Sequence, residues 1–314
     1  MRLRGPAIVV LALGLSLAGF SLGTRAPASP DAPTARRKPA IHTADLRPGR
    51  FNRLDWRAAQ RDEASFPECL GHPVASCVIV HGKGERVMLM GDSLARMWLP
   101  AFIRIARAGD LTLAVAIHPS CPWPENLDGL GISPDCTLRR ADWYHRVIPA
   151  FAPQIVFFAN RHYDAPGDVL PIAIDGRNLP ATDPLAVKTI AKLTLQSLIT
   201  LRRPGRELVM LEPAPLPPAI NYDPMVCVAT GSAQCSFSVN PHTTPLTVVD
   251  RDLAAAPDVW SVNLDQLACP RFPVCDSIVG GTIVRRAHTH LTATYARAVG
   301  VRLAAILRAQ HILR

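Results

Sequence analysis

The 314 residues suit one mid-sized domain with flanking segments, or at most two small domains, and the 48% hydrophobic content argues against an intrinsically disordered chain. The net charge of +9 would suit a nucleic-acid-binding protein, but the charge is not spread evenly. Residues 1–61 hold 11 Lys/Arg and 3 Asp/Glu, whereas residues 62–314 hold 23 Lys/Arg and 22 Asp/Glu. Most of the chain is therefore nearly neutral, and we expect no nucleic acid among its partners.

The first 28 residues have the layout of a secretory signal. Arg2 and Arg4 precede an uncharged apolar run over residues 6–23, and the small-residue sequence Ala26-Pro27-Ala28 follows it. The run is also just long enough to span a bilayer, so a cleaved signal peptide and an N-terminal membrane anchor are both open interpretations. Either one predicts an exported, extracytoplasmic protein, secreted or tethered to the cytoplasmic membrane.

Residues 29–60 are rich in proline, alanine and arginine, which predicts a linker rather than a folded segment. Their positive charge would suit contact with anionic lipid headgroups or wall polymers. A solvated linker, held open by repulsion between its own charges, is the simpler interpretation. We expect the folded domain to occupy residues 61–314.

Apolar strand patterns and helical patterns alternate along this domain. The predicted strands are residues 86–90, 111–117, 154–159, 207–211 and 259–264, and the predicted helices are residues 94–108, 183–203 and 291–313. Asp183 is a natural N-cap, with Pro184 at the first helical position. Continuous apolar strands between helices predict an α/β fold, a three-layer α/β/α sandwich of the flavodoxin-like kind with a parallel sheet of about five strands. Reactive groups in such folds gather at the carboxyl ends of the strands.

The eight cysteines form four close pairs in chain order. In an exported chain such pairs predict disulfides, here Cys69–Cys77, Cys121–Cys136, Cys227–Cys235 and Cys269–Cys275. Zinc is the competing interpretation, but no pair has C-x-x-C spacing. His118, His162 and Asp164 are spaced too irregularly for a metal site. We therefore expect neither a metal nor another cofactor.

Gly91-Asp92-Ser93 follows the first predicted strand and opens a helix. A serine in this position gains from the free N–H groups of the helix N-terminus, which can hold a developing oxyanion. Gly91 permits a tight turn, and Asp92 can cap the helix. An ordinary strand-to-helix turn with a polar cap is the alternative interpretation of the same tripeptide.

His288-Thr289-His290 opens the final predicted helix. This places His290 at the same rim of the sheet as Ser93, where it could take the serine's proton. A lone histidine at a helix start is more often a polar surface residue. Its combination with a serine at the end of the first strand favours a nucleophile–base pair.

From Cys69 to its end, the chain resembles the SGNH hydrolase domain found at the C-terminus of bacterial membrane-bound acyltransferases of acyltransferase family three. The matching features are the first cysteine pair, the strand ending in Gly91-Asp92-Ser93, Trp98, Cys121-Pro122 with Cys136, Asn160-Arg161, the last cysteine pair, and His290-Leu291-Thr292. The resemblance implies an SGNH fold with Ser93 as nucleophile and His290 as base. It also implies an oxyanion hole formed by the Ser93 N–H and Asn160, with a further donor from Gly129 or Gly131.

Two positions depart from the family pattern. His162 stands where a tryptophan often follows the third-strand arginine. Ala287 stands where the family has the triad aspartate, three residues before the histidine. Asp276 is the nearest upstream acid, and Asp92, Arg161 and His288 are the other candidates for a supporting role. A Ser–His dyad, a relocated acid and an inactive site are all compatible with this pattern.

The sequence therefore predicts an exported SGNH-type serine esterase or O-acyltransferase, acting on acyl esters, acetyl in particular, of cell-envelope carbohydrate. The alternative is a catalytically weak or inactive module that binds glycan or partners a membrane acyltransferase. Because the chain has at most one apolar segment of membrane-spanning length, any supply of acyl groups across a membrane would come from a separate partner.

Overall fold

The computed structural model describes residues 54–161, 163–218, 223–229, 235–240 and 243–314. The predicted signal or anchor and most of the predicted linker lie outside these residues. The end of the linker differs from the prediction, because Trp56–Gln60 forms helix α1. Asp55 caps this helix by accepting a hydrogen bond from the backbone N–H of Ala58 at 2.9 Å. Ala59 is buried in one cluster with Met225 and Ile283, so the chain is already folded here.

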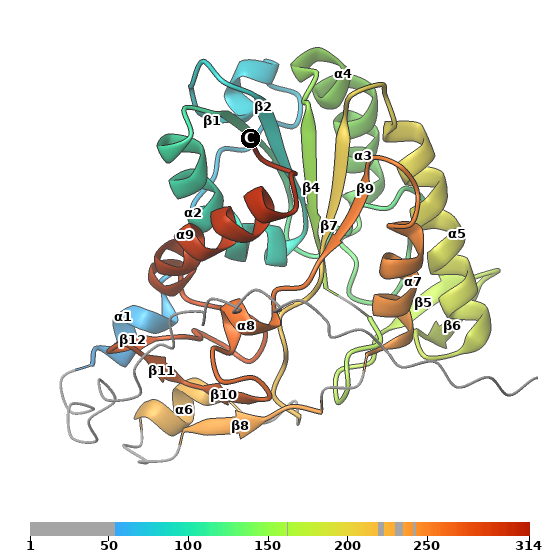
Figure 1. The fold of residues 1–314 in the computed structure, drawn as a ribbon. Coiled ribbons are helices and arrows are strands. Elements are labelled where there is room, and N and C mark those ends of the chain that lie inside the picture. The colour runs from blue at the N-terminus through green and yellow to red at the C-terminus, as the bar shows by residue number, and fades with distance from the viewer. Residues whose placement is uncertain (1–53, 162, 219–222, 230–234, 241–242) are drawn as a thin grey trace, which may run out of the picture. The chain divides into compact units, whose positions relative to one another are not determined.

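The central sheet has six strands in the order β1-β3-β2-β4-β7-β9 (Figure 1). They span Val78–Val80, Thr112–Ile117, Arg86–Gly91, Ile155–Ala159, Glu207–Leu211 and Val259–Val262, in that order. The five predicted strands are confirmed and are mutually parallel. The sixth strand, β1, pairs antiparallel with β3 at one edge. It has only three residues, too few for a periodic signal in the sequence.

Helices cover both faces of this sheet, as the predicted three-layer architecture requires (Figure 1). One face carries α2 (Ser93–Ala108) and α9 (Ala293–Ala309). The other carries α3 (Cys136–Asp142), α4 (Ile148–Phe151), α5 (Pro184–Leu201) and α7 (Pro245–Leu253), with a π-helical turn at Trp143–Val147 between α3 and α4. Asp183 caps α5 by accepting from the N–H of Leu185 at 2.8 Å, as predicted.

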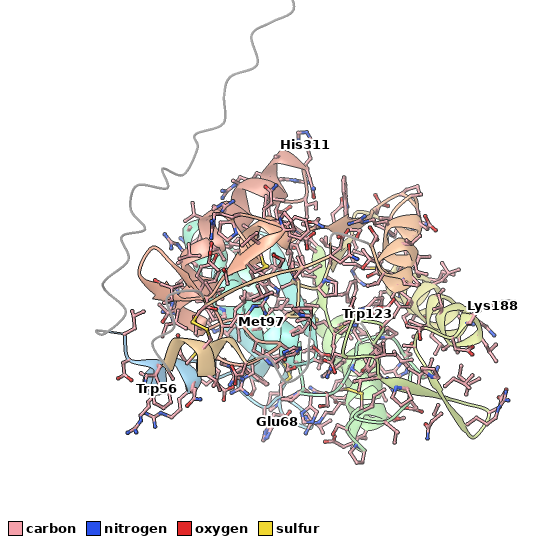
Figure 2. The ribbon with its side chains drawn as sticks, turned by 90° about the horizontal axis from the view of Figure 1, so that it is seen from below. Trp56, Glu68, Met97, Trp123, Lys188 and His311 are labelled. Carbon is pink, nitrogen blue, oxygen red and sulfur yellow. A yellow bond between two sulfur atoms is a disulfide. The ribbon has the colours of Figure 1, made fainter. Side chains whose placement is uncertain are left out.

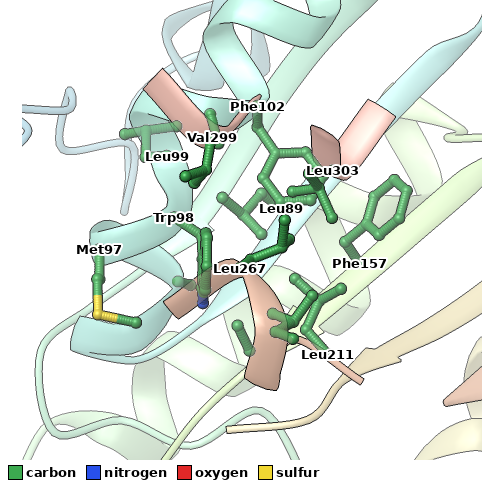
Figure 3. Close-up of a cluster of buried hydrophobic side chains, with 14 of the residues drawn as sticks. Leu89, Met97, Trp98, Leu99, Phe102, Phe157, Leu211, Leu267, Val299 and Leu303 are labelled. Atoms are coloured by element: carbon green, nitrogen blue, oxygen red, sulfur yellow. The ribbon is translucent and has the colours of Figure 1, made fainter. Parts of the chain in front are cut away.

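Strand residues alternate between two apolar cores. Leu89 contributes to the core under α2 and α9, whereas Met88 and Met90 contribute to the core on the opposite face. In the first core Phe102 of α2 packs against Phe157 of β4 with ring centroids 4.7 Å apart (Figure 3). Two packed faces explain why the strands read as continuous apolar runs.

Smaller elements lie outside the sandwich. Three two-stranded sheets pair β5 (Pro171–Ile174) with β6 (Arg177–Pro180), β8 (Ser236–Ser238) with β10 (Val274–Asp276), and β11 (Ile278–Val279) with β12 (Thr282–Ile283). Two short helices, α6 (Pro224–Ala229) and α8 (Asp265–Ala268), and a 3₁₀ turn at Val74–Cys77 complete the described elements. The strands β8, β10, β11 and β12 lie together with α1 and α6 below the sheet in Figure 1.

All eight cysteines are paired, in the four disulfides that their order in the chain predicts: Cys69–Cys77, Cys121–Cys136, Cys227–Cys235 and Cys269–Cys275. Figure 2 shows disulfides as yellow bonds, with Glu68 and Lys188 at the surface and Met97 in the interior. Four disulfides are typical of a protein that folds in an oxidising, extracytoplasmic compartment. In the described part of the chain, no helix is both long enough and apolar enough to cross a membrane.

The final helix begins later than predicted. Its N-cap is Thr292, whose hydroxyl accepts from the N–H of Tyr295 at 3.1 Å and donates to the carbonyl of Ile283 at 2.7 Å. His290 therefore does not open the helix but lies in the turn before it, which is closed by a bridge between Arg285 and Leu291. The apolar pattern of the sequence suggested a start at Leu291, but the hydroxyl of Thr292 caps the helix, which therefore begins at Ala293.

Candidate active site

Gly91 brings the first parallel strand very close to its neighbour. Its φ of +139° is one that residues with side chains rarely adopt, and a Cβ there would lie 2.0 Å from the carbonyl oxygen of Ala159. The backbone of β2 therefore passes directly against the end of β4. As a result, Ser93 at the start of α2 and Asn160 just after β4 lie on the same rim of the sheet.

Asp92 joins these two strand ends. It is 3% exposed, and its carboxylate accepts from the N–H of Leu94 at 2.8 Å and from the N–H of Arg161 at 3.0 Å. One side chain thus caps α2 and fixes the backbone beyond β4. Residues 91–94 and 159–161, held together in this way, form what we call the serine wall. Ser93 occupies the first helical position, where the N–H has no partner within the helix.

His290 lies in a second structure, residues 284–292, which we call the histidine wall. The turn closes through a hydrogen bond from the N–H of Arg286 to the carbonyl of His290 at 2.9 Å. Nδ1 of His290 is 2.7 Å from the hydroxyl of Thr289. Nε2 is buried and has no hydrogen-bond partner among the described residues, so it is not bonded to Ser93 in this state.

Arg285 holds the histidine wall against the loop after β7. It is 1% exposed, and its guanidinium donates to the carbonyl of Pro215 and, at 3.4 Å, to that of His288. The group also lies 5.5 Å from the ring centroid of Phe237. Burial lowers the pKa of Arg285 to about 10, which leaves it charged at neutral pH. A buried cation therefore fixes two loops through their carbonyl groups.

Ser93 and His290 both line a cavity of about 210 Å³. They also both line a second, much smaller cavity, together with Glu63, Arg96 and Arg286. Glu63 forms ion pairs with these two arginines at 2.8 and 2.5 Å. The structure thus brings the two predicted reactive side chains to one place, with the larger cavity beside them.

The surroundings of His290 favour its neutral form. Burial lowers the pKa of this imidazole, and the positive charges of Arg286 and Arg161 lower it further, to about 4. A neutral imidazole can accept a proton, which is the property a general base needs. The described residues offer no carboxylate hydrogen bond to the ring, since its Nδ1 meets a threonine hydroxyl.

Comparison with known proteins identifies the fold family. Residues 59–305 match the model of the family described as SGNH domain, fused to AT3 domains. The chain belongs to this family. Among curated proteins, none matches the chain.

Two solved structures similar to this SGNH domain come from different sources. The periplasmic domain of the lipopolysaccharide acetyltransferase of Salmonella ser. Paratyphi A aligns over 84% of this chain and 100% of its own, with 14% identity and a TM-score of 0.53. A carbohydrate esterase family 2 enzyme with a carbohydrate-binding domain, from Corynascus thermopiles (Myceliophthora fergusii), aligns over 74% of this chain and 68% of its own, with 16% identity and a TM-score of 0.43. At such identities the first likeness supports the fold alone.

Among the described residues, no carboxylate is hydrogen-bonded to the imidazole of His290 in this SGNH domain. Asp276, the nearest upstream acid, lies in β10 and forms an ion pair with Arg271. Neither it nor His288 is among the described residues that line the Ser93 cavity. Ala287 remains the position at which the family pattern is broken.

Asn160 and Arg161 differ in how they face the cavity. The side-chain amide of Asn160 donates to the carbonyl of Arg161 at 2.9 Å, and Asn160 is not among the described lining residues. Arg161 does line the cavity, and its guanidinium pairs with the buried Asp168. Of the two, Arg161 is therefore the one placed beside Ser93 and His290 in this state.

The remaining candidates lie elsewhere. Gly129 bridges to Ile172 of β5, and Gly131 has a φ of +80° in the same loop. Neither lines the cavity in the described part of the chain. His118 lies 3.4 Å from Asp135, His162 is outside the described residues, and Asp164 accepts from the N–H of Leu246 at 2.7 Å. His118 and Asp164 therefore have different partners, and neither is among the described residues that line the cavity.

One set of polar residues on the cavity lining was not predicted from the sequence. Glu212 follows β7, Asn263 follows β9, and Asp265 begins α8. Together with Arg251 of α7 they line the cavity that contains Ser93. The rule that reactive groups gather at the carboxyl ends of parallel strands, which led to Ser93, would also have identified Glu212. It would have missed Asn263, because the predicted strand extended to residue 264 whereas β9 ends at Val262.

Proposed function

We propose that this exported SGNH domain is a serine esterase or O-acyltransferase that acts on acyl esters of cell-envelope carbohydrate. Ser93 attacks the acyl carbonyl and His290 takes its proton. The N–H of Ser93 stabilises the tetrahedral oxyanion, and Asn160 supplies a second donor after its amide turns away from the carbonyl of Arg161. His290 delivers this proton to the leaving ester oxygen as the ester C–O bond breaks, which leaves the acyl group on Ser93. It then takes the proton of the sugar hydroxyl or water that attacks the acyl-enzyme, and returns it to the Ser93 oxygen as the acyl group departs.

The observation that carries this proposal is that Ser93 and His290 line the same cavities. The serine lies at a helix N-terminus and the histidine has an unbonded, buried Nε2, and both face the same cavities. Nucleophile and base are often further apart in a free enzyme than in its substrate complex. The low pKa of His290 keeps the base neutral throughout the physiological range.

The substrate class is inferred from the family and the fold. The Salmonella structure of the same fold is the periplasmic domain of a lipopolysaccharide acetyltransferase. An acetyl group and an envelope carbohydrate are accordingly the donor and acceptor classes that we propose. Four disulfides and the signal-like or anchor-like first 28 residues support an extracytoplasmic location, secreted or tethered to the membrane.

Hydrolysis of p-nitrophenyl acetate by the full-length protein, purified after export, tests this function. Ser93→Ala should lower kcat/KM by about 100-fold or more, and His290→Gln by a similar factor, because nucleophile and base act as a unit. Ser76→Ala, in the loop closed by Cys69–Cys77, is the matched control and should leave the rate unchanged. Equal rates in wild type and Ser93→Ala, with both folded, would refute the proposal.

Ala287 supports a second candidate, a catalytically weak or inactive domain that binds glycan or partners a membrane acyltransferase. A missing triad acid can cost on the order of 10⁴ in turnover. The arginines around His290 also oppose the imidazolium that forms during attack. For this candidate we expect glycan binding that survives Ser93→Ala, together with no Ser93-dependent turnover.

A further inference from the structure

Four polar side chains form a connected group on the cavity lining, which we call the far cluster: Glu212, Arg251, Asn263 and Asp265. Glu212 is 4% exposed and stands at the centre of the group. Its carboxylate accepts two hydrogen bonds from Arg251, at 2.8 and 2.7 Å, and one from the amide of Asn263 at 2.9 Å. Asn263 in turn donates to the carboxylate of Asp265 at 3.0 Å.

The far cluster and Ser93 belong to different strands of one rim. Going along the sheet from β2, the next strands are β4, β7 and β9. Neighbouring strands lie about 4.8 Å apart, so the rims of β7 and β9 are about 10 and 14 Å from that of β2. This is further than the width of one sugar ring. A group bound at the far cluster would therefore lie beyond the sugar whose ester is at Ser93.

We infer that the far cluster is a binding subsite for the hydroxyl groups of a neutral sugar, adjacent in an oligosaccharide to the sugar that carries the acyl group. The inference rests on the proposed function, since it takes Ser93 as the place where the ester reacts. It goes beyond it by naming the second sugar residue, its charge and the side chains that recognise it.

The hydrogen bonding of the far cluster suits this role. Glu212 is fully engaged, and it fixes the orientation of Arg251 and Asn263. Arg251, Asn263 and Asp265 are at least partly exposed and line the cavity. Both amide N–H groups of Asn263 are used within the cluster, but Arg251 keeps guanidinium donors beyond those bonded to Glu212. The carboxylate of Asp265 and the Oδ1 of Asn263 keep acceptor capacity, so a sugar hydroxyl group can both accept and donate here. Side chains oriented in advance lose little entropy when a ligand binds.

The charge of the far cluster selects against acidic sugars. Arg251 and Glu212 form an ion pair, and in the described part of the chain the carboxylate of Asp265 has a hydrogen bond from Asn263 but no ion pair of its own. A second negative charge brought close to these carboxylates would be repelled, whereas a neutral sugar would not.

The cavity that contains Ser93 and the far cluster is lined mostly by apolar surface. Its lining includes Pro213, Pro215, Leu216, Val239 and Phe272. Ligand sites commonly combine such apolar walls with a few polar groups that fix orientation. The C–H face of a sugar ring can pack against this wall while its hydroxyl groups reach the polar groups at the end.

The test compares kcat/KM for p-nitrophenyl acetate with kcat/KM for the acetates of glucose, cellobiose and maltose. In Asp265→Asn and in Asn263→Ala, the ratio of disaccharide to p-nitrophenyl ester activity should fall about tenfold or more, because hydroxyl contacts are lost only for the longer substrate. The ratio of glucose acetate to p-nitrophenyl acetate activity should change by less than about twofold. Asp175→Asn, in the exposed turn between β5 and β6, is the matched control and should leave every ratio unchanged.

An unchanged disaccharide ratio in both variants, with wild-type unfolding temperatures, would overturn the inference. An equal loss on all substrates would overturn it too, because it would indicate a role at Ser93 instead. Failure of the proposed function has another signature, the absence of Ser93-dependent hydrolysis of p-nitrophenyl acetate in the wild type. In that case, calorimetric titration with unacylated cellobiose and maltose decides: affinity lowered about tenfold by Asp265→Asn supports the subsite, and unaltered or undetectable binding refutes it.

Discussion

Ser93 and His290 are each positioned by one buried charged residue, but the two residues act on different kinds of structure. Asp92 is an anion that accepts from backbone N–H groups at the ends of a helix and a strand. Arg285 is a cation that donates to the carbonyl groups of two irregular loops. The serine wall is therefore an extension of the sheet, whereas among the described residues the histidine wall is joined to the loop after β7 by the guanidinium of Arg285. This difference predicts which part of the site tolerates change.

Gly91→Ala should have the largest effect on stability. The new Cβ would lie 2.0 Å from a backbone oxygen of β4, and neither strand can move away without breaking the parallel pairing. We expect the free energy of unfolding to fall by about 4 kcal/mol or more, measured by denaturant titration. Gly176→Ala is the control, because Gly176 has a positive φ of +74° with nothing within 4 Å. It should cost only about 1–2 kcal/mol, and equal losses would show that the clash is not decisive.

Arg285→Met should have the next largest effect and should act on activity as well. The carbonyl groups of Pro215 and His288 would lose a charged donor, at a cost of about 2–3 kcal/mol in the free energy of unfolding. Because His290 is attached through the same wall, kcat/KM for p-nitrophenyl acetate should fall together with stability. Arg271→Met removes an exposed ion pair with Asp276 and should cost less than about 1 kcal/mol. An Arg285 variant that is as active and stable as the wild type would contradict the assigned role.

Asp92→Asn tests the buried charge that positions the serine wall. An asparagine can still cap α2 through its one side-chain oxygen. It lacks the second carboxylate oxygen, so the N–H groups of Leu94 and Arg161 can no longer each bond to an oxygen of their own. We expect a loss of about 1–2 kcal/mol in thermal or chemical unfolding. Asp183→Asn is the matched control, because Asp183 caps α5 through a single bond to Leu185. Asparagine and aspartate cap about equally well, so this control should be nearly neutral, and a neutral Asp92→Asn would show that the bond to Arg161 contributes little.

The two walls also differ in how far the sequence predicted them. Gly91, Asp92 and Ser93 lie at the end of a buried strand that reads as a continuous apolar run, and the predicted element borders hold here to within one residue. The cap at Asp183 was equally readable, because capping is a local interaction. Arg285 gave no signal, since its partner Pro215 lies 70 residues earlier in the chain and is recognised through a carbonyl that every residue possesses. The start of α9 was placed two residues too early, because Leu291 fits the apolar pattern of the helix whereas the cap is Thr292.

The pH dependence of the protein should reflect the arginine-rich surroundings of His290. The pKa of His290 is lowered from 6.5 to about 4, so the unfolded chain binds a proton more readily than the folded one between these values. The free energy of unfolding should therefore fall as the pH is lowered from about 6.5 to about 4. His290→Gln should reduce this slope. The acid limb of kcat/KM should lie near pH 4, and a limb near pH 6.5 would contradict the lowered pKa of His290.

Ala287→Asp makes the smallest change in structure but tests the comparison most directly, because it adds a carboxylate to the wall that has none beside the imidazole. Ala287 is only partly buried, so a slightly larger side chain can be accommodated. A carboxylate bonded to Nδ1 in place of the Thr289 hydroxyl would fix the tautomer of His290 and stabilise the imidazolium formed as Ser93 attacks. We expect kcat to rise by about tenfold or more and the acid limb to move up by about one pH unit, because a nearby negative charge raises the pKa of an imidazole.

Ala287→Asn has the same shape without the charge and should leave the limb in place. A carboxylate that acts on catalysis must also depend on the nucleophile, so the double variant with Ser93→Ala should be inactive. If Ala287→Asp leaves both kcat and the acid limb unchanged, the carboxylate does not reach the ring, and the histidine wall does not have the geometry of the family's triad.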